Sequence, residues 1–174
     1  MIKMTDEVVL VLQTGGTIDK DYPHVKGGYA FEIGESAVMV MMQRIRTDVT
    51  FEYQTVCRKD SQDIDDDDRE LLWKTCQQAT QKTILITHGT DTMIETAAYL
   101  AKRRLPNKNI VLTGAFLPAT FKKSEAEFNI GVALGALQCL TECDVYIAMT
   151  GRVLRWDKVT RDNLNGKCIA ILKG

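Results

Sequence analysis

The sequence lacks a long apolar run and a strong net charge. Its apolar run near the N-terminus covers only residues 8–12 and follows two acidic residues, so it is too short for a membrane span. The 22 basic and 23 acidic residues leave a net charge of −1, which argues against nucleic acid as the main partner. We therefore expect neither a membrane nor a nucleic acid as a partner.

The sequence is also poor in histidine. His24 and His88 are the only two histidines among 174 residues, so a zinc site is not expected. The acidic run DIDDDD at residues 63–68 is best interpreted as the first turn of a helix, where carboxylates face the positive end of the helix dipole. We therefore expect no metal ion and no cofactor.

The five cysteines form no recognisable metal-binding pattern. Their odd number, with no secretion signal recognised at the N-terminus, fits reduced thiols and predicts a cytoplasmic protein. Cys139 and Cys143 are four residues apart on an expected helix. Because no CxxC motif and no nearby histidine completes a site, we interpret this pair as part of the buried core.

Length and hydrophobic patterning indicate one α/β domain over residues 1–174. Hydrophobic residues make up 45% of the chain and charged residues 26%, the ordinary balance of a globular protein with a sizeable core. Short apolar runs alternate with amphipathic segments, which predicts a mostly parallel sheet with helices on both faces. The expected strands are 8–12, 50–57, 83–87, 109–113, 144–149 and 167–172, and the expected helices are 35–46, 65–80, 92–104 and 127–140.

Polar residues follow each of the first five expected strands. In such a sheet the ligand crevice lies beyond the carboxyl ends of the strands, so these five loops would open on one edge. The loops read TGGTIDKDY, RKDSQD, HGTDT, GAFLPAT and GRVLRWDK. They supply hydroxyl, amide, carboxylate and cationic side chains: Thr17, Ser61, Gln62, Asp63, Thr90, Asp91, Lys158 and Arg161.

The first loop places a threonine directly after two glycines. Gly15 and Gly16 allow a sharp turn and a close approach of the backbone to a ligand. Thr17 then either carries its hydroxyl into the crevice or only completes the turn.

The loop HGTDT repeats this situation after another strand. Gly89 permits a tight turn, and Thr92 with Glu95 three residues later has the spacing of a capping box for the next helix. Since Thr92 is assigned to capping, Thr90 and Asp91 are left as candidates for the crevice.

The two glycine loops together resemble the signature segments of a known family. TGGTID at 14–19 and THGTDTMIET at 87–96 are similar to those of the asparaginase family, the L-asparaginases and their glutaminase relatives. DSQD at 60–63, GAFLP at 114–118 and FN at 128–129 resemble further segments of its larger N-terminal domain. The resemblance implies a flavodoxin-like three-layer sandwich and a homodimer or higher homo-oligomer. It leads us to expect a single domain of this type, with the C-terminal asparaginase domain absent.

The resemblance also implies roles for individual residues. Thr17 corresponds to the nucleophile on the flexible loop, and Thr90 with Asp91 to the second threonine and its neighbouring aspartate. Ser61 corresponds to the hydroxyl that holds the α-carboxylate of the substrate, while Asp91 would face the α-ammonium. The other positions carried over are Gln62 beside Ser61, Gly16, Gly89, the backbone contact at Ala115, and a lid tyrosine at Tyr22, for which Tyr29 is a possible substitute.

These groups are suited to hydrolysis of a small amide. A threonine hydroxyl is a weak nucleophile that needs a base, and backbone N–H groups near Gly16 or Thr90 would stabilise the oxyanion of the intermediate. The implied activity is that of an amidohydrolase. It would convert the side-chain amide of L-asparagine, or a related amide, to the acid and ammonia through an acyl-enzyme on Thr17.

Two departures from the family leave alternatives open. An ungapped comparison puts Arg161 where the family has a lysine, with Lys158 three residues earlier, and an arginine stays protonated. Either residue could take the role of the lysine. Asp60 also adds a negative charge beside the expected carboxylate pocket. The competing functions are a non-catalytic protein that binds an amino acid and a glutaminase-like subunit that supplies ammonia to another enzyme.

Overall fold

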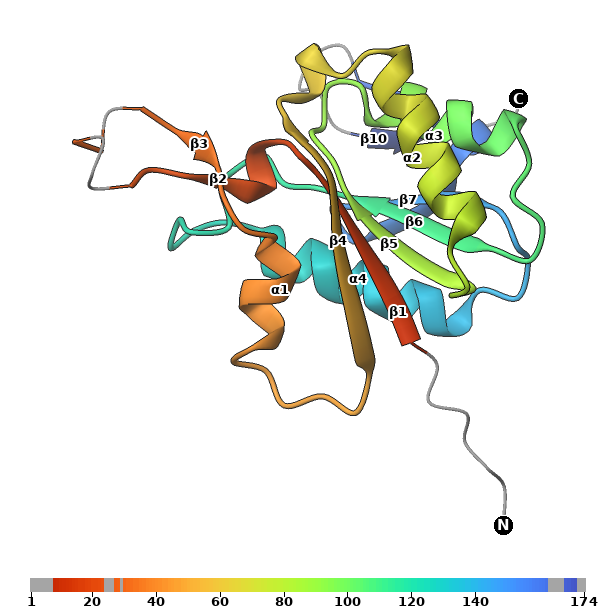
Figure 1. Cartoon of the computed structure of the whole chain (residues 1–174), viewed down its shortest axis with the longest axis horizontal. Coiled ribbons are helices and arrows are strands. Elements are labelled where there is room, and N and C mark those ends of the chain that lie inside the picture. Colours follow the sequence, from red (N-terminus) through yellow and green to blue (C-terminus); the bar gives the residue numbers. More distant parts are fainter. Residues whose placement is uncertain (1–7, 24–26, 29, 163–167, 172–174) are drawn as a thin grey trace.

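A six-stranded sheet with the order β4-β1-β5-β6-β7-β8 forms the centre of the computed structural model (Figure 1). The structure describes residues 8–23, 27–28, 30–162 and 168–171. The first five strands in this order run parallel, and β8 pairs antiparallel with β7. The bounds are β1 Val8–Gly15, β4 Thr50–Lys59, β5 Thr83–Thr87, β6 Asn109–Thr113, β7 Val145–Met149 and β8 Arg152–Arg155.

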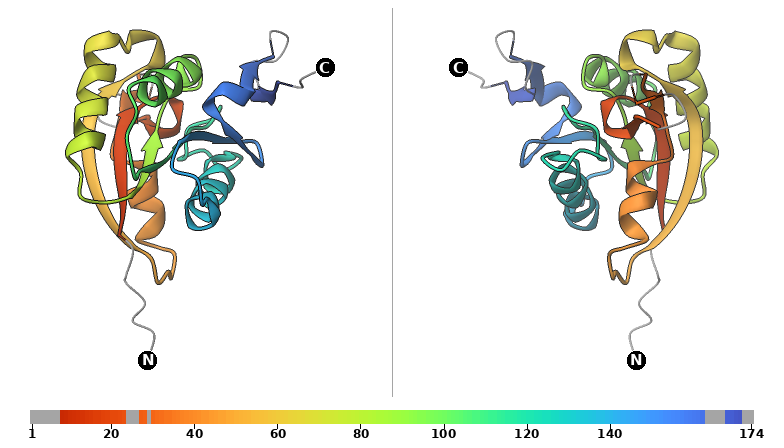
Figure 2. Two further views of the ribbon diagram at one scale, coloured as in Figure 1. Left: turned by 90° about the vertical axis from the view of Figure 1, so that its right-hand side faces the viewer. Right: turned by 90° about the vertical axis from the view of Figure 1, so that its left-hand side faces the viewer.

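Helices cover both faces of this sheet. On one face α2 (Asp66–Gln78) and α3 (Met93–Lys102) pack on the strands, and on the other α1 (Ala37–Met42) and α4 (Ala126–Cys139) do so. Figure 2 shows the sheet edge-on between the yellow-green helices and the cyan α4. Counted along the chain, the parallel strands have the order 2-1-3-4-5, which is that of flavodoxin-like folds. The predicted α/β three-layer class is therefore confirmed.

The central strands are apolar because both of their faces are covered. In β5 all five residues are buried, with Ile84 and Ile86 packing toward α2 and α3 and Leu85 toward α1 and α4. Strand β4 lies at the edge of the sheet and is largely exposed, which explains its polar TFEYQTVCRK sequence. The core thus holds the carboxyl ends of β1 and β5 rigidly in the middle of the sheet.

Several elements differ from those expected. The helix expected at 35–46 is only the short α1, and the strand expected at 167–172 lies outside the main sheet. Strand β10 (Cys168–Ala170) instead pairs antiparallel with β9 (Val159–Arg161). The antiparallel pair β2 (Lys20–Asp21) and β3 (Glu32–Ile33), as well as β8, was not predicted from sequence.

The expectation that Cys139 and Cys143 belong to the core is wrong. Both side chains are exposed. Helix α4 buries the face formed by Ala126, Ile130, Ala133 and Leu137, Cys139 ends the helix on another side, and Cys143 lies beyond its end. Within the described part of the chain, no helix is long and apolar enough to cross a membrane.

Candidate active site

The site lies where the chain leaves β1 and β5, at the carboxyl edge of the sheet. These neighbouring strands end in register, with Gln13 beside Thr87. Strand β1 lies between β4, the next parallel strand along the chain, and β5, the one after it. The direction in which successive strands are added to the sheet therefore reverses at β1. Ligands of open α/β sheets bind at such a switch point.

Glycines allow three loops to pack against one another at this point. A Cβ atom on Gly16 would collide with the backbone of Gly89, and Gly16 has a φ of 83°. A Cβ on Gly89 would lie 2.6 Å from the Ser61 Oγ, and one on Gly15 would lie 2.5 Å from the Lys59 carbonyl oxygen. Side chains at these glycines would force apart the loops that carry Thr17, Ser61 and the HGTDT segment.

Ser61 links the loop after β4 to the loop after β5. It is buried at the start of a short 3-10 turn, and its Oγ accepts a hydrogen bond of 3.2 Å from the Asp91 N–H. The Thr92 hydroxyl donates to the Ser61 carbonyl at 2.7 Å, and the Gln62 amide donates to Asp91 Oδ2 at 2.8 Å. The predicted grouping of Ser61, Gln62 and Asp91 is therefore present in the fold.

The capping box expected from Thr92 and Glu95 is absent from α3. Thr92 is the N-cap residue by position, but its side chain makes no capping hydrogen bond, since its hydroxyl is used by Ser61. A capping box does occur at α2, where the side chains of Asp65 and Asp68 each accept from the other's backbone N–H. The acidic run thus starts a helix, as its interpretation predicted.

Arg161 contacts Asp91 through two hydrogen bonds. Its Nη2 lies 2.7 Å from Asp91 Oδ1, and its Nη1 donates to the Asp91 carbonyl oxygen at 2.9 Å. The Gln62 amide and then Arg161 hold the pKa of the Asp91 carboxyl below its usual range. The Nζ of Lys158 lies 3.6 Å from the Asp157 carboxylate. Of the two candidate cations, the fold brings Arg161 to Asp91.

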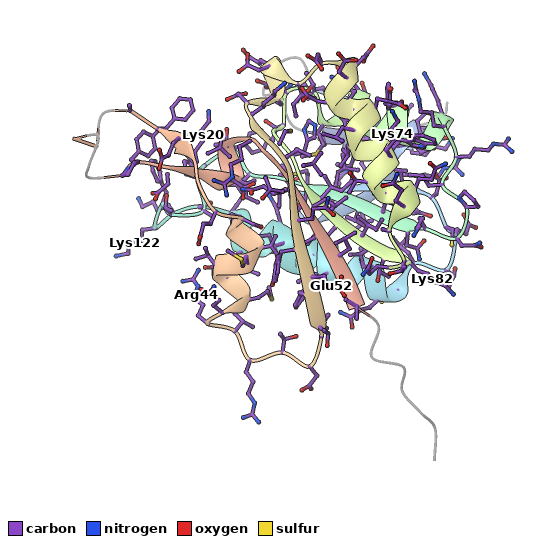
Figure 3. All side chains as sticks on the ribbon, viewed as in Figure 1. Lys20, Arg44, Glu52, Lys74, Lys82 and Lys122 are labelled. Atoms are coloured by element: carbon purple, nitrogen blue, oxygen red, sulfur yellow. The ribbon has the colours of Figure 1, made fainter. Side chains whose placement is uncertain are left out.

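The charge of Asp60 is paired within the site region. Its carboxylate lies 2.8 Å from the Lys20 Nζ, and this contact holds the pKa of Asp60 below its usual value. Lys20, labelled in Figure 3 at the base of the β2–β3 hairpin, also lies 4.2 Å from the centre of the Phe31 ring. Asp60 therefore adds little net negative charge beside Ser61.

Thr17 and Thr90 are half-buried at this edge of the sheet. Within the described residues, neither hydroxyl has a hydrogen-bond partner, and the same holds for the Thr90 N–H. The Gly16 N–H, in contrast, donates to the Lys59 carbonyl oxygen at 2.9 Å. Of the two positions expected to supply an oxyanion donor, Thr90 has its N–H available and Gly16 does not.

Comparison with known proteins identifies the family. The family model described as "Asparaginase, N-terminal" matches residues 8–166. The chain belongs to the asparaginase family. It is 30% identical over 159 residues to the "Probable L-asparaginase periplasmic" of Haemophilus influenzae and 29% identical over 161 residues to L-asparaginase 2 of Escherichia coli. These alignments cover 88% and 89% of this chain, and 46% of each relative.

A solved asparaginase structure has the same fold. The thermostable L-asparaginase from Thermococcus kodakarensis matches with a TM-score of 0.83 and 27% identity, over 94% of this chain and 51% of that chain. The chain thus spans about half the length of the asparaginases it matches. The comparisons agree with the resemblance that the two glycine loops indicated.

Two further positions carried over from the asparaginase family are Tyr22 and Ala115. Tyr22 follows β2, is 37% exposed, and contacts the rings of Phe31 and Phe121 at centroid distances of 6.3 and 5.8 Å. Its substitute, Tyr29, lies outside the described residues. Ala115 is buried two residues after the end of β6. Asp63, from the loop after β4, is exposed.

Two buried titratable residues within the asparaginase motifs were not predicted from the sequence as functional residues. Asp19 is 3% exposed, and burial raises its pKa to about 6, although hydrogen bonds from Ala37 and Thr87 partly oppose this. His88 is fully buried, and burial lowers its pKa to about 4. Each lies within a quoted motif, TGGTID or HGTDT, but only the packing shows that its side chain points inward. The described residues contain no group of three His, Cys, Asp or Glu side chains placed to bind a metal ion.

Proposed function

We propose that this chain is an amidohydrolase of the asparaginase type. It would hydrolyse the side-chain amide of L-asparagine, or of a related small amide, through an acyl-enzyme on Thr17. One observation carries this proposal. The loops of Thr17 and Thr90 pack against each other at Gly16 and Gly89, and the Thr90 loop is bonded to Ser61 through the Asp91 N–H. The two threonine hydroxyls and the Thr90 N–H have no structural partner among the described residues, so they are available to a substrate.

The proposed reaction proceeds in two steps. The Thr17 oxygen attacks the amide carbonyl carbon while its proton passes to the leaving nitrogen, and the C–N bond then breaks to release ammonia. Water next attacks the ester on Thr17, which frees the acid and restores the hydroxyl. The Thr90 N–H would stabilise the oxyanion in both steps, because a fixed donor in a partly dry site costs no reorganisation. Thr17 is thus the proposed nucleophile and Thr90 the proposed oxyanion donor.

Substrate recognition would use the groups around Asp91. The Ser61 hydroxyl and Gln62 would bind the α-carboxylate, and Asp91 the α-ammonium. Arg161 would hold Asp91 in place and could stabilise negative charge, but it cannot accept a proton as a lysine can. Lys158, whose Nζ lies 3.6 Å from the Asp157 carboxylate, is the alternative candidate for that role.

The test of this function is ammonia release from L-asparagine, L-glutamine and small β-amides. We expect release by the wild-type chain and its loss in Thr17→Ala. A matched control is Thr80→Ala, because Thr80 is exposed and precedes β5 at the opposite edge of the sheet. Full activity in Thr17→Ala would remove Thr17 as the nucleophile, and equal losses in both variants would point to misfolding.

A non-catalytic protein that binds an amino acid is the second candidate. The observation that favours it is the permanently charged Arg161 on Asp91, which cannot serve as a base. Calorimetric binding of L-aspartate or L-asparagine without any ammonia release would support this function over the first.

The assembly and location stay predictions. We propose a homodimer or higher homo-oligomer formed by this single N-terminal-type domain, and sedimentation at micromolar concentration tests it, since a strictly monomeric profile would contradict it. The five cysteines are free, which agrees with the proposed cytoplasmic location.

A further inference from the structure

The imidazole of His88 is buried directly beneath the HGTDT loop. Its Nδ1 lies 2.8 Å from the Gly89 carbonyl oxygen, and its Nε2 lies 2.9 Å from the Thr96 hydroxyl of α3. The Thr96 oxygen also accepts a hydrogen bond of 3.2 Å from the Arg69 Nε of α2, and Arg69 is paired with Asp66. A chain of polar contacts therefore runs from the first turn of α2 to the backbone of the proposed site.

These contacts determine which ring nitrogen carries the proton. A carbonyl oxygen can only accept a hydrogen bond, so Nδ1 must be the donor toward Gly89. The Arg69 Nε can only donate, which leaves the Thr96 hydroxyl free to donate to Nε2. Both contacts are satisfied at once by a neutral ring protonated on Nδ1. Full burial of the ring favours this uncharged form.

The bond to the Gly89 carbonyl fixes the direction of the next N–H. The described residues contain no cis peptide bond, so the Gly89–Thr90 peptide is trans. In a trans peptide the C=O and N–H point in opposite directions. Because the carbonyl points inward to the buried ring, the Thr90 N–H points away from it, and it has no partner among the described residues.

Glycine at position 89 leaves the backbone with conformational freedom that an external hydrogen bond can restrain. Glycine explores more backbone conformations than other residues, and a side chain here would strike Ser61. Gly114 also packs against the His88 carbonyl, where a Cβ would collide with that oxygen, so the backbone before Gly89 is held on its other side. The His88 ring then restrains the peptide that follows.

We propose that His88 is a positioning residue that orients the Thr90 N–H by holding the Gly89 carbonyl through its Nδ1–H. This inference rests on the proposed function for its effect on rate. It does not rest on that function for its effect on the peptide, which can be measured without turnover. His88 contacts no reacting atom in this scheme and acts only through the Gly89–Thr90 peptide.

A pair of variants separates this role from simple core packing. The side-chain amide of asparagine places an N–H near the position of Nδ1, whereas that of glutamine reaches the position of Nε2. His88→Asn thus keeps the donor to Gly89 and loses the contact with Thr96, and His88→Gln does the reverse. If His88 only filled the core, the two variants would behave alike or the larger glutamine would be the milder change.

The experiment combines kinetics with amide NMR. We expect His88→Gln to lower kcat by about 10- to 100-fold with little change in KM, and His88→Asn to stay within about 3-fold of the wild type. In ¹H–¹⁵N spectra, the Thr90 resonance should move in His88→Gln and stay near its wild-type position in His88→Asn. An unmoved Thr90 resonance in His88→Gln, or equal shifts in both variants, would overturn the proposal.

The wild-type chain provides a measurement that needs no variant of His88. Imidazole ¹⁵N spectra distinguish the two tautomers, and His24→Gln identifies the signal of His88, because the chain has only two histidines. A proton on Nδ1 is expected, and a proton on Nε2 alone would refute the proposal even if both variants failed to fold. A wild-type chain without amidase activity would defeat the proposed function while the NMR results still decide the orientation of the peptide.

Discussion

The buried carboxyl of Asp19 makes the stability of this protein depend on pH in an unusual direction. Its Oδ1 accepts from the Ala37 N–H at 2.8 Å and its Oδ2 from the Thr87 hydroxyl at 3.0 Å, in the turn that begins with Thr17. These two donors do not compensate fully for burial, and the pKa of Asp19 is raised from 3.8 to about 6. Ionisation of Asp19 therefore opposes folding.

The size of this effect follows from proton linkage. Below pH 3.8 the Asp19 carboxyl is mostly neutral in both the folded and the unfolded chain. Between pH 3.8 and about pH 6 the unfolded chain loses the proton that the folded chain keeps. A stabilising contribution that is complete below pH 3.8 is thus lost as pH rises through about 6. A pKa raised from 3.8 to about 6 corresponds to about 3 kcal/mol, and Asp19 is too buried for solvent to screen much of this energy.

Asp19→Asn removes this titration while it preserves the shape of the side chain. The asparagine oxygen can accept from Ala37, and the Thr87 hydroxyl can rotate to accept from the new amide. Relative to the wild type, we expect the free energy of unfolding of the variant to rise by about 2.5 kcal/mol between pH 4 and pH 8, because part of the total is already lost at pH 4. Urea denaturation at closely spaced pH values measures this difference, in which the titrations common to both proteins cancel.

The control for removal of one negative charge is Asp48→Asn, since Asp48 is exposed in the loop before β4. A difference between Asp19→Asn and the wild type that stays constant with pH would refute the reasoning. A difference that falls as pH rises would show that the hydrogen bonds from Ala37 and Thr87 outweigh burial.

Two further predictions concern the packing of the loops and the cation on Asp91. Gly16→Ala should lower the free energy of unfolding by about 2 kcal/mol or more, because Gly16 has a positive φ and a Cβ there would clash with Gly89. The control Gly131→Ala on α4 places its Cβ in open space and should raise the free energy of unfolding by up to about 1 kcal/mol. Urea denaturation measures both changes. Arg161→Ala should reduce kcat/KM for the amide by about 100-fold, Arg161→Lys should reduce it less, and Lys158→Ala should change it by less than about 2-fold. The reverse order in steady-state assays would show that Lys158 is the working cation.

Much of the site could be predicted from sequence because its parts are local motifs at strand ends. Once the alternation of strands and helices indicated a parallel sheet, TGGTID and HGTDT had to open on the same edge. Ser61, Gln62 and Asp91 were grouped correctly for this reason. Their catalytic and binding roles stay predictions.

The sequence predictions failed or stayed open where a side chain had a choice between a local and a distant partner. Thr92 has the spacing of a capping residue, but its hydroxyl binds the Ser61 carbonyl from another loop. Arg161 and Lys158 are equivalent candidates along the chain, and their difference comes from the β9–β10 pair, which places Arg161 on Asp91 across 70 positions of sequence. Cys139 and Cys143 were assigned to the core because no CxxC motif and no nearby histidine completed a site, but that absence does not determine which side chains a helix buries.

The sequence by itself determined the class of the sheet, the family and the loops that form the site, since hydrophobic periodicity and glycine motifs act over short stretches of chain. Only the tertiary structure decided the protonation and partners of the groups within that site. Asp19 and His88 are ordinary polar residues in the sequence, and they become a carboxyl with a raised pKa and a neutral, singly protonated imidazole because the packed sheet and helices remove them from water. Burial and long-range hydrogen bonding depend on the whole fold, so no local pattern could have revealed them.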